Sequence, residues 1–173
     1  VLVTTDNAPA LAAALADELT AAVWAQRDGF IGGVATFPEV TQTLRRLDAG
    51  DIPGAGPLVL VDIADNPWSG GPGDSAELVR FLIQERVAGA AVALVKDPAV
   101  VEAAFAAGPR ATITVELGGK TDRLHGDPVP IRGRVRYLGD GRWTHEGPEN
   151  AGVPVELGPV AVLRVDGVNL ILT

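Results

Sequence analysis

The residue types that could carry chemistry are concentrated in one short stretch, residues 65–75. It reads Asp-Asn-Pro-Trp-Ser-Gly-Gly-Pro-Gly-Asp-Ser. The apolar run at 57–62 before it predicts a buried strand, and the pattern at 76–82 after it predicts a helix. Glycine-rich turns between a strand and a helix are common ligand sites in open α/β sheets, because the first N–H groups of the helix have no partners there.

The chemistry expected of this loop is the binding of an anionic group. Its three glycines would let the backbone approach a ligand closely, and its N–H groups could hold a substrate carboxylate. The loop matches neither Gly-x-Gly-x-x-Gly nor a P-loop, which argues against a nucleotide. The candidate cleft residues are Asp65, Asn66, Pro67, Gly70, Gly71, Gly73 and Asp74.

A purely structural turn is the alternative for the same residues. Asp74 is a good helix N-cap, and Glu77 follows three residues later as in a capping box. We therefore predict that Asp74 caps a helix beginning near Ser75. We also predict that Gly71 or Gly73 needs a positive φ or a close contact that a side chain would prevent.

Three further residues are secondary candidates, each with a plain alternative. Lys120 follows a predicted strand and could reach a carboxylate or phosphate, although a solvated hairpin loop is the favoured interpretation. His145 and Glu146 form a titratable pair in another predicted loop. The chain has two histidines, twenty residues apart, and no cysteine, so we expect no complete metal site in it.

Composition limits the function classes. The 173 residues carry a net charge of −8, which argues against nucleic acid and anionic membranes as partners. No apolar run is long enough to cross a bilayer, so a cytoplasmic protein is expected. The chain contains no Met and begins and ends in apolar segments. We therefore expect a piece of a larger protein.

The hydrophobic pattern predicts an α/β fold. Strands are expected at 1–4, 58–62 and 90–95, with helices at about 9–26, from 38, at 76–82 and from 98. Alternating runs near 111–117 and 129–137 precede a hairpin around Asp166 and Gly167. We predict one domain over residues 1–173. In it a βαβ-type sheet with flanking helices, at about 1–110, is followed by an antiparallel β extension, at about 111–173.

Several segments together resemble a known family. Leu-Val-Asp-Ile-Ala-Asp-Asn-Pro at 60–67 and Gly-Gly-Pro-Gly-Asp at 70–74 are similar to the signature of the carboxyl-terminal domain of the MlrC (microcystinase C-like) family. Gly-Gly-Lys at 118–120 with Gly-Asp-Pro at 126–128 resembles a second family segment. Residues 144–159 resemble a third. The chain departs from the family at Trp68 and Ser69, where glycines are usual, and at His145, where Asn is common.

The resemblance implies a zinc-dependent hydrolase of the peptidase type, whose metal ligands lie in a preceding N-terminal catalytic domain. This domain would bind no cofactor and would be inactive alone, while it completes the substrate cleft and packs against the catalytic domain. The implied substrate is small and peptide-like, and a homo-oligomer is left open. The alternative is a non-catalytic binding or assembly module in which the glycine-rich loop is only a helix cap.

Overall fold

The structure is a computed structural model that describes residues 1–30, 32–53 and 56–173. The chain divides into two compact units, Val1–Pro53 and Gly54–Thr173, which are described separately. None of the described helices is both long and apolar enough to cross a membrane.

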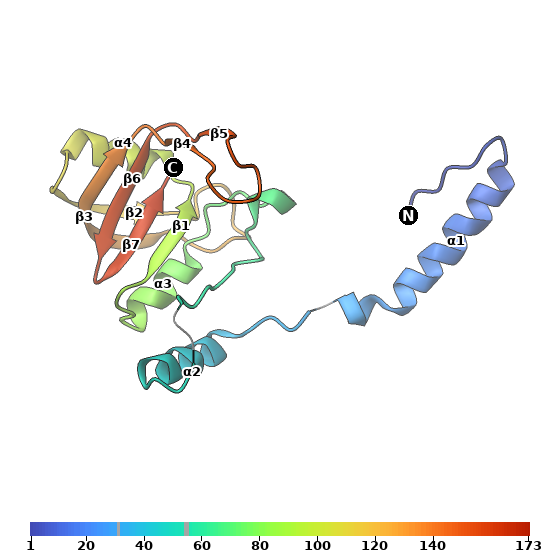
Figure 1. Cartoon of the computed structure of the whole chain (residues 1–173), viewed down its shortest axis with the longest axis horizontal. Helices are drawn as coiled ribbons and strands as arrows, with labels where there is room; N and C mark the ends of the chain where they lie inside the picture. The colour runs from blue at the N-terminus through green and yellow to red at the C-terminus, as the bar shows by residue number, and fades with distance from the viewer. Residues whose placement is uncertain (31, 54–55) are drawn as a thin grey trace. The chain divides into compact units, whose positions relative to one another are not determined.

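The first unit is helical. It contains α1 (Pro9–Ala25), the short 3-10 helix η1 (Arg27–Phe30) and α2 (Phe37–Asp48) (Figure 1). Both predicted helices are present, and the Glu39 carboxylate accepts the Thr36 N–H at 2.7 Å at the start of α2. The predicted strand at 1–4 is not formed. The apolar stripe of α1, such as Leu11 and Val23, is exposed because no described residue covers it.

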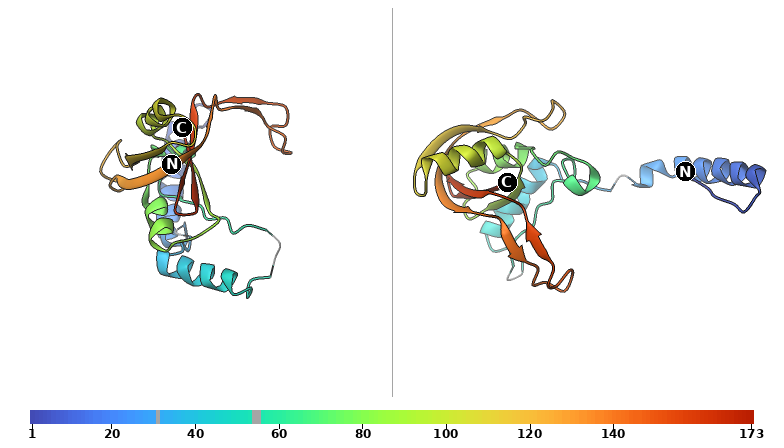
Figure 2. Two further views of the ribbon diagram at one scale, coloured as in Figure 1. Left: turned by 90° about the vertical axis from the view of Figure 1, so that its left-hand side faces the viewer. Right: turned by 90° about the horizontal axis from the view of Figure 1, so that it is seen from above.

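The second unit is built around a mixed sheet with strand order β1-β7-β6-β3-β2. The β1–β7 pair is parallel, and the other three pairs are antiparallel. A separate two-stranded sheet, β4–β5, projects from it (Figure 2). The elements are η2 (Pro67–Ser69), α3 (Glu77–Gln84), β1 (Ala91–Val95), α4 (Pro98–Ala107), β2 (Thr112–Leu117), β3 (Val129–Gly139), β4 (Arg142–Thr144), β5 (Pro154–Glu156), β6 (Val160–Val165) and β7 (Val168–Leu172).

The α/β class predicted from the sequence is confirmed, with a different origin for the parallel pair. The run at 58–62 is extended but pairs with no described strand, and Val59 and Val61 are 74% and 72% exposed. The strand predicted at 90–95 is β1, but it lies at the sheet edge and is mostly exposed. Its parallel neighbour, β7, comes from the far end of the chain. The parallel pair therefore joins two strands that lie far apart in the chain.

The core lies on one face of the five-stranded sheet. Along β7, Val168, Leu170 and Leu172 are fully buried, whereas the residues between them are partly exposed. The buried faces of α3 and α4 supply Val79, Leu82, Val100, Val101 and Ala104. Burying each large apolar side chain contributes about 1.5–3 kcal/mol, so this layer supplies most of the stabilisation. Both helices of the second unit, α3 and α4, contribute buried residues to this one core.

The hairpin turn between β6 and β7 follows the sequence prediction. Asp166 and Gly167 both have positive φ, 44° and 96°, as the two central residues of a type I′ turn require. This turn fixes the register of the two central strands, with Val165 opposite Val168. Through β7 it also fixes the end of the chain beside β1. There the Thr173 carbonyl accepts the N–H of Asp97 at 2.8 Å.

Candidate functional site

The loop at 65–75 is closed by its own hydrogen bonds. The carbonyl of Asn66 accepts the N–H groups of Ser69 and Gly71, at 2.9 and 3.0 Å, and the carbonyl of Pro67 accepts that of Gly70 at 3.1 Å. These bonds form the short helix η2 and the turn after it. Many of the loop's N–H groups, which the sequence analysis expected to face a ligand, therefore form hydrogen bonds within the chain. This arrangement favours a structural role for the loop.

Asp65 holds the two arms of the loop together. Its carboxylate accepts the N–H of Gly73 at 2.8 Å and that of Ser75 at 2.6 Å. The residue is only 7% exposed. Because a buried carboxylate needs such donors to offset its desolvation, Asp65 and the two N–H groups stabilise one another.

Asp74 does not cap the helix, contrary to the prediction. Helix α3 begins at Glu77, without a side-chain cap. Instead, Asp74 Oδ2 accepts the N–H groups of Lys120 and Thr121 at 2.9 and 2.8 Å. The Asp74 carbonyl accepts the N–H of Gly119 at 2.7 Å. The helix starts too far along the chain for Asp74 to serve it, whereas the turn at 118–121 offers several converging N–H donors.

The environment of Asp74 makes its carboxylate an acid of low pKa. Burial acts to raise the pKa, but the N–H donors of Thr121 and Lys120 outweigh it, so the pKa lies below the usual value. The second carboxylate oxygen, Oδ1, is buried and has no hydrogen-bond partner among the described residues.

The two glycines singled out from the sequence are required by close packing, as predicted. A Cβ on Gly71 would lie 2.8 Å from Asp65 Oδ1 and 2.9 Å from the Asn66 nitrogen. Gly73 has φ +75°, and its Cβ would lie 2.9 Å from Pro67 Cγ. The glycines therefore allow the Asp65 carboxylate and the η2 turn to approach the backbone.

Asp97 is a third buried acid of this region, and its contacts with distant segments were not foreseen from the sequence. Its side chain caps α4 through the Val100 N–H at 3.2 Å and accepts the Gly118 N–H at 2.9 Å. It also forms an ion pair with Lys120, with Nζ 2.6 Å from Oδ2. Asp-Pro before an apolar helix signals the cap, but no local pattern links Asp97 to residues more than twenty positions away.

The turn at 122–128 packs against α3. Gly126 has φ +91°, and a Cβ there would lie 2.6 Å from Glu77 Oε1. Arg80, which pairs with Glu77, donates to the Asp127 carbonyl at 2.9 Å. His125 Nδ1 lies 2.9 Å from the Asp122 carboxylate, and this hydrogen bond raises the pKa of His125. The structure thus joins three separate segments, 65–77, 96–97 and 118–128.

The joined segments coincide with a known sequence family. The family described as MlrC C-terminus matches residues 60–173, which include all three segments. The chain belongs to the MlrC C-terminus family. The resemblance inferred from the motifs is therefore confirmed.

Two relatives support this membership. Microcystinase C of Sphingomonas sp. is 32% identical over 84 residues, which are 49% of this chain and 17% of that protein. The crystal structure of a protein named Putative metallopeptidase, from Mesorhizobium sp. BNC1, superposes with a TM-score of 0.72 at 31% identity. That match covers 90% of this chain and 30% of the other. The chain therefore spans less than a third of each relative.

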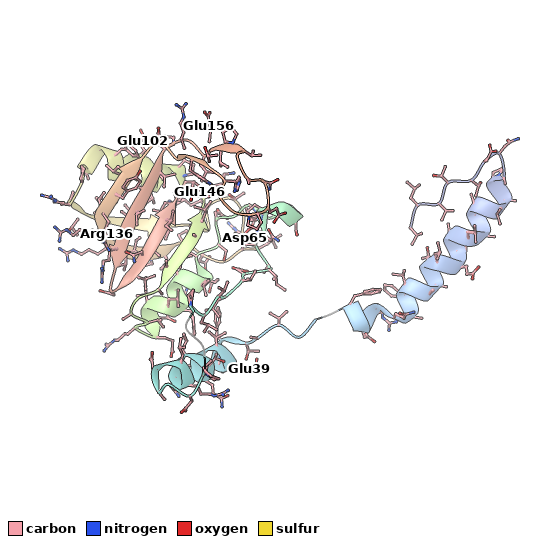
Figure 3. All side chains as sticks on the ribbon, viewed as in Figure 1. Glu39, Asp65, Glu102, Arg136, Glu146 and Glu156 are labelled. Atoms are coloured by element: carbon pink, nitrogen blue, oxygen red, sulfur yellow. The ribbon has the colours of Figure 1, made fainter. Side chains whose placement is uncertain are left out.

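The secondary candidates lie in different elements. Lys120 belongs to the joined segments, where its ammonium reaches the Asp97 carboxylate. His145 and Glu146 follow β4 in the projecting hairpin, where the rings of His145 and Trp143 meet edge to face at 6.3 Å. Figure 3 labels Asp65 and Glu146 on their separate segments.

The acids of this MlrC C-terminal region do not fit a zinc ion. The carboxylate oxygens of Asp65 and Asp97, and Oδ2 of Asp74, all accept from N–H groups or from the Lys120 ammonium, so the donors around them are positively polarised. Within residues 1–30, 32–53 and 56–173, no group of three or more His, Asp or Glu side chains is arranged to hold a metal.

Proposed function

We propose that this chain is the accessory carboxyl-terminal part of a zinc-dependent hydrolase of peptide or amide bonds. In that enzyme, it would border the substrate cleft and pack against an N-terminal catalytic domain that holds the metal. The observation that carries the proposal is the family match over 60–173, which includes the whole of the joined segments. The likeness to a structure named as a metallopeptidase supports the reaction class.

The geometry divides the loop into a fixed base and an exposed tip. Asp65, Gly73 and Asp74 form the base and are buried. Ser69 and Gly70 at the tip are exposed. The base would set the position of the tip, and the tip would be the part available to a substrate, because Ser69 and Gly70 are exposed.

The assembly alternative stays open for a specific reason. The N–H groups of Ser69, Gly70, Gly71, Gly73 and Ser75 are all engaged within the chain. A loop that only supports packing against another domain would show the same pattern. The two roles differ in what a change at the tip does to turnover.

The test uses the full-length parent enzyme on a panel of peptides, with zinc removed by chelation and then restored. Activity that returns with zinc is expected. Ser69→Trp and Ser69→Ala should lower kcat/KM by on the order of tenfold or more, with little change in melting temperature, since bulk or a lost polar group at a cleft acts on the transition state.

Gln42→Trp, at an exposed position of α2, is the matched control for added bulk. Wild-type kinetics for both loop variants would assign the loop to packing rather than to the cleft. Peptide hydrolysis that is indifferent to zinc would contradict the proposed reaction class.

A further inference from the structure

The face of the five-stranded sheet that points away from the buried core carries a cluster of arginines. In the strand register, Arg134 of β3 lies directly opposite Arg164 of β6. Arg136 Nη1 donates to Asn169 Oδ1 on β7 at 3.3 Å, which places Arg136 over the same face. Arg132 lies two residues before Arg134 and is also exposed. Figure 3 labels Arg136 on this side of the sheet.

This arrangement is unfavourable for the isolated chain. Like charges directly opposite one another on neighbouring strands destabilise a sheet. None of the four arginines forms an ion pair with a described carboxylate. Register places one acid, Glu116, on this face, opposite Pro130 at the β2 end. Four of the chain's 14 Lys and Arg residues thus gather, without neutralising partners, on a protein of net charge −8.

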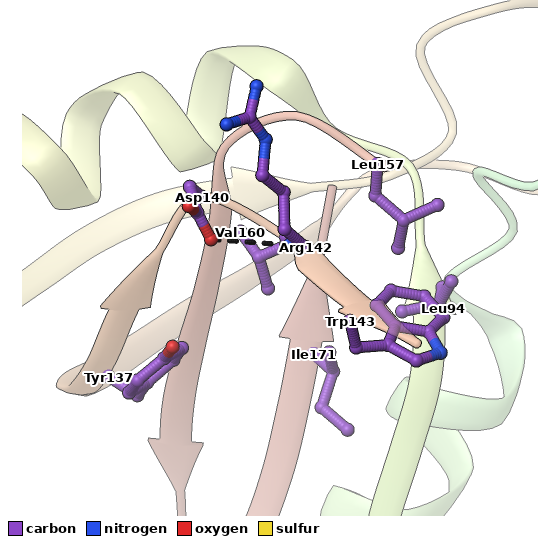
Figure 4. Close-up of a pocket in the computed structure, with 9 residues that line it drawn as sticks. Leu94, Tyr137, Asp140, Arg142, Trp143, Leu157, Val160 and Ile171 are labelled. Atoms are coloured by element: carbon purple, nitrogen blue, oxygen red, sulfur yellow. Dashed lines mark hydrogen bonds between the residues drawn. The ribbon is translucent and has the colours of Figure 1, made fainter. Parts of the chain in front are cut away.

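An apolar hollow adjoins the arginines on the same face. One row further along the strands, Tyr137 pairs with Val162, which pairs with Ile171. A pocket of about 210 Å³ opens over this row, as Figure 4 shows. Most of its lining is apolar, and the residues that line it are Leu94, Tyr137, Asp140, Gly141, Arg142, Trp143, Leu157, Val160 and Ile171.

The pocket lies beside a bulge in β1, a bulge in β3 and the projecting β4–β5 hairpin. Leu94 is an extra residue in the β1–β7 register, and it is 47% exposed. Bulges of this kind re-aim a side chain away from the regular pleat. The β4–β5 hairpin adds Trp143 of β4 to the same lining, so the pocket has both an aromatic and an aliphatic wall.

The two features are spaced for an extended peptide. Side chains two residues apart on one face of a strand are about 7 Å apart, which separates the arginine row from the apolar row. An extended peptide has the same spacing between its own side chains i and i+2. Arginine also binds carboxylates through two parallel hydrogen bonds, which suits an acidic side chain.

We propose that this face binds an extended peptide segment with an acidic side chain on the arginines and an apolar side chain, two residues away, in the pocket. The proposal is independent of the hydrolase function. Nucleic acid is disfavoured, because the rest of the chain is acidic and would repel a phosphate backbone beyond the patch.

The test is fluorescence polarisation with the purified chain at low ionic strength. The probe is the labelled peptide Gly-Ser-Glu-Thr-Phe-Gly, with Gln in place of Glu and Ala in place of Phe as comparison peptides. Saturable binding of the first peptide is expected, with each comparison peptide on the order of tenfold weaker. Binding should also weaken as salt is added.

The double variant Arg134→Gln and Arg164→Gln should lose the preference for Glu over Gln but keep that for Phe over Ala. The double variant Leu94→Ser and Trp143→Ser should lose the preference for Phe over Ala but keep that for Glu over Gln. The control is the double variant Arg45→Gln and Arg46→Gln, at exposed positions of α2. It removes the same charge as the first double variant and should leave binding unchanged. Urea unfolding verifies that every variant is folded.

Four results would overturn the proposal. One is no saturable binding at about 1 mM peptide, and another is equal binding of all three peptides. The third is self-association seen by sedimentation and abolished by the double arginine variant, which would assign the face to a second copy. A full-length parent that fails to bind the peptide, although the chain does, would assign the face to a domain interface and would also contradict it.

Discussion

Two buried aspartates in the family segment make different contacts at the two ends of one loop. Asp65 joins Gly73 and Ser75 within the loop, whereas Asp74 fastens the loop to the turn at 118–121. Both act as acceptors for backbone N–H groups, and neither is arranged as a metal ligand. At this scale, the hydrogen bonds that build the loop account for the two acids of the motif without a catalytic role.

Asp65 should be among the most stabilising polar residues of the chain. Asp65→Ala removes the acceptor for two N–H groups, so the free energy of unfolding should fall by about 3 kcal/mol, measured by urea denaturation. Asp62→Ala is the control, since Asp62 is exposed and accepts the Ala64 N–H of its own turn, at 3.0 Å. A loss below about 1 kcal/mol for Asp65→Ala would show that the loop does not depend on this carboxylate.

Asp74 should make stability depend on acid pH. Because its pKa in the folded chain is below the usual value, its contribution is present above the unfolded pKa of about 4 and is lost as pH falls through the folded value. The stability difference between wild type and Asp74→Asn should therefore shrink on acidification from pH 5 to pH 2. A difference that stays constant over that range would contradict this assignment.

At the scale of elements, one side chain couples three of them. Asp97 links the end of β1 to α4 through its cap and to the turn at 118–120 through Gly118 and Lys120. Its backbone N–H also bonds to Thr173, next to the end of β7. The position of the turn relative to the sheet therefore depends on a residue outside the glycine-rich motif.

Asp97→Ala should destabilise the chain by about 3 kcal/mol, because it removes a helix cap and leaves the Gly118 N–H unpaired. Lys120→Met should cost less, about 1 kcal/mol or below, because the Lys120 side chain is 40% exposed and solvent screens the pair. Thermal or urea unfolding of both variants measures this order. Lys120→Met as costly as Asp97→Ala would assign the dominant contribution to the ion pair.

At the scale of the whole molecule, the buried apolar core lies entirely within the second unit, between Ala76 and Leu172. The helices of the first unit contain no buried residues. The extended run at 58–63 is apolar and exposed, with Ile63 at 59%. The two units differ in hydrophobic stabilisation, because among the described residues only the second unit has a packed apolar layer between helices and sheet.

A truncated chain of residues 56–173 should therefore unfold cooperatively in urea. Its midpoint, followed by circular dichroism, should equal that of the whole chain. The helices of the first unit contain no fully buried residue, so we expect them to contribute little to that transition. A truncated chain without a cooperative transition would show that residues 1–53 support the sheet.

The sequence by itself determined the helices α1 to α4, the β6–β7 hairpin, the need for glycine at 71 and 73, and the family. Those features depend on local periodicity, turn chemistry and motif order. Only the tertiary structure decided that β1 pairs with β7, that Asp74 serves the turn at 118–121 and that Asp97 meets Lys120. Each of these joins residues far apart in the chain, and local patterns carry no information about such pairings. The run at 58–62 shows the same limit: its strand propensity is real, but a strand forms only where a partner supplies its hydrogen bonds.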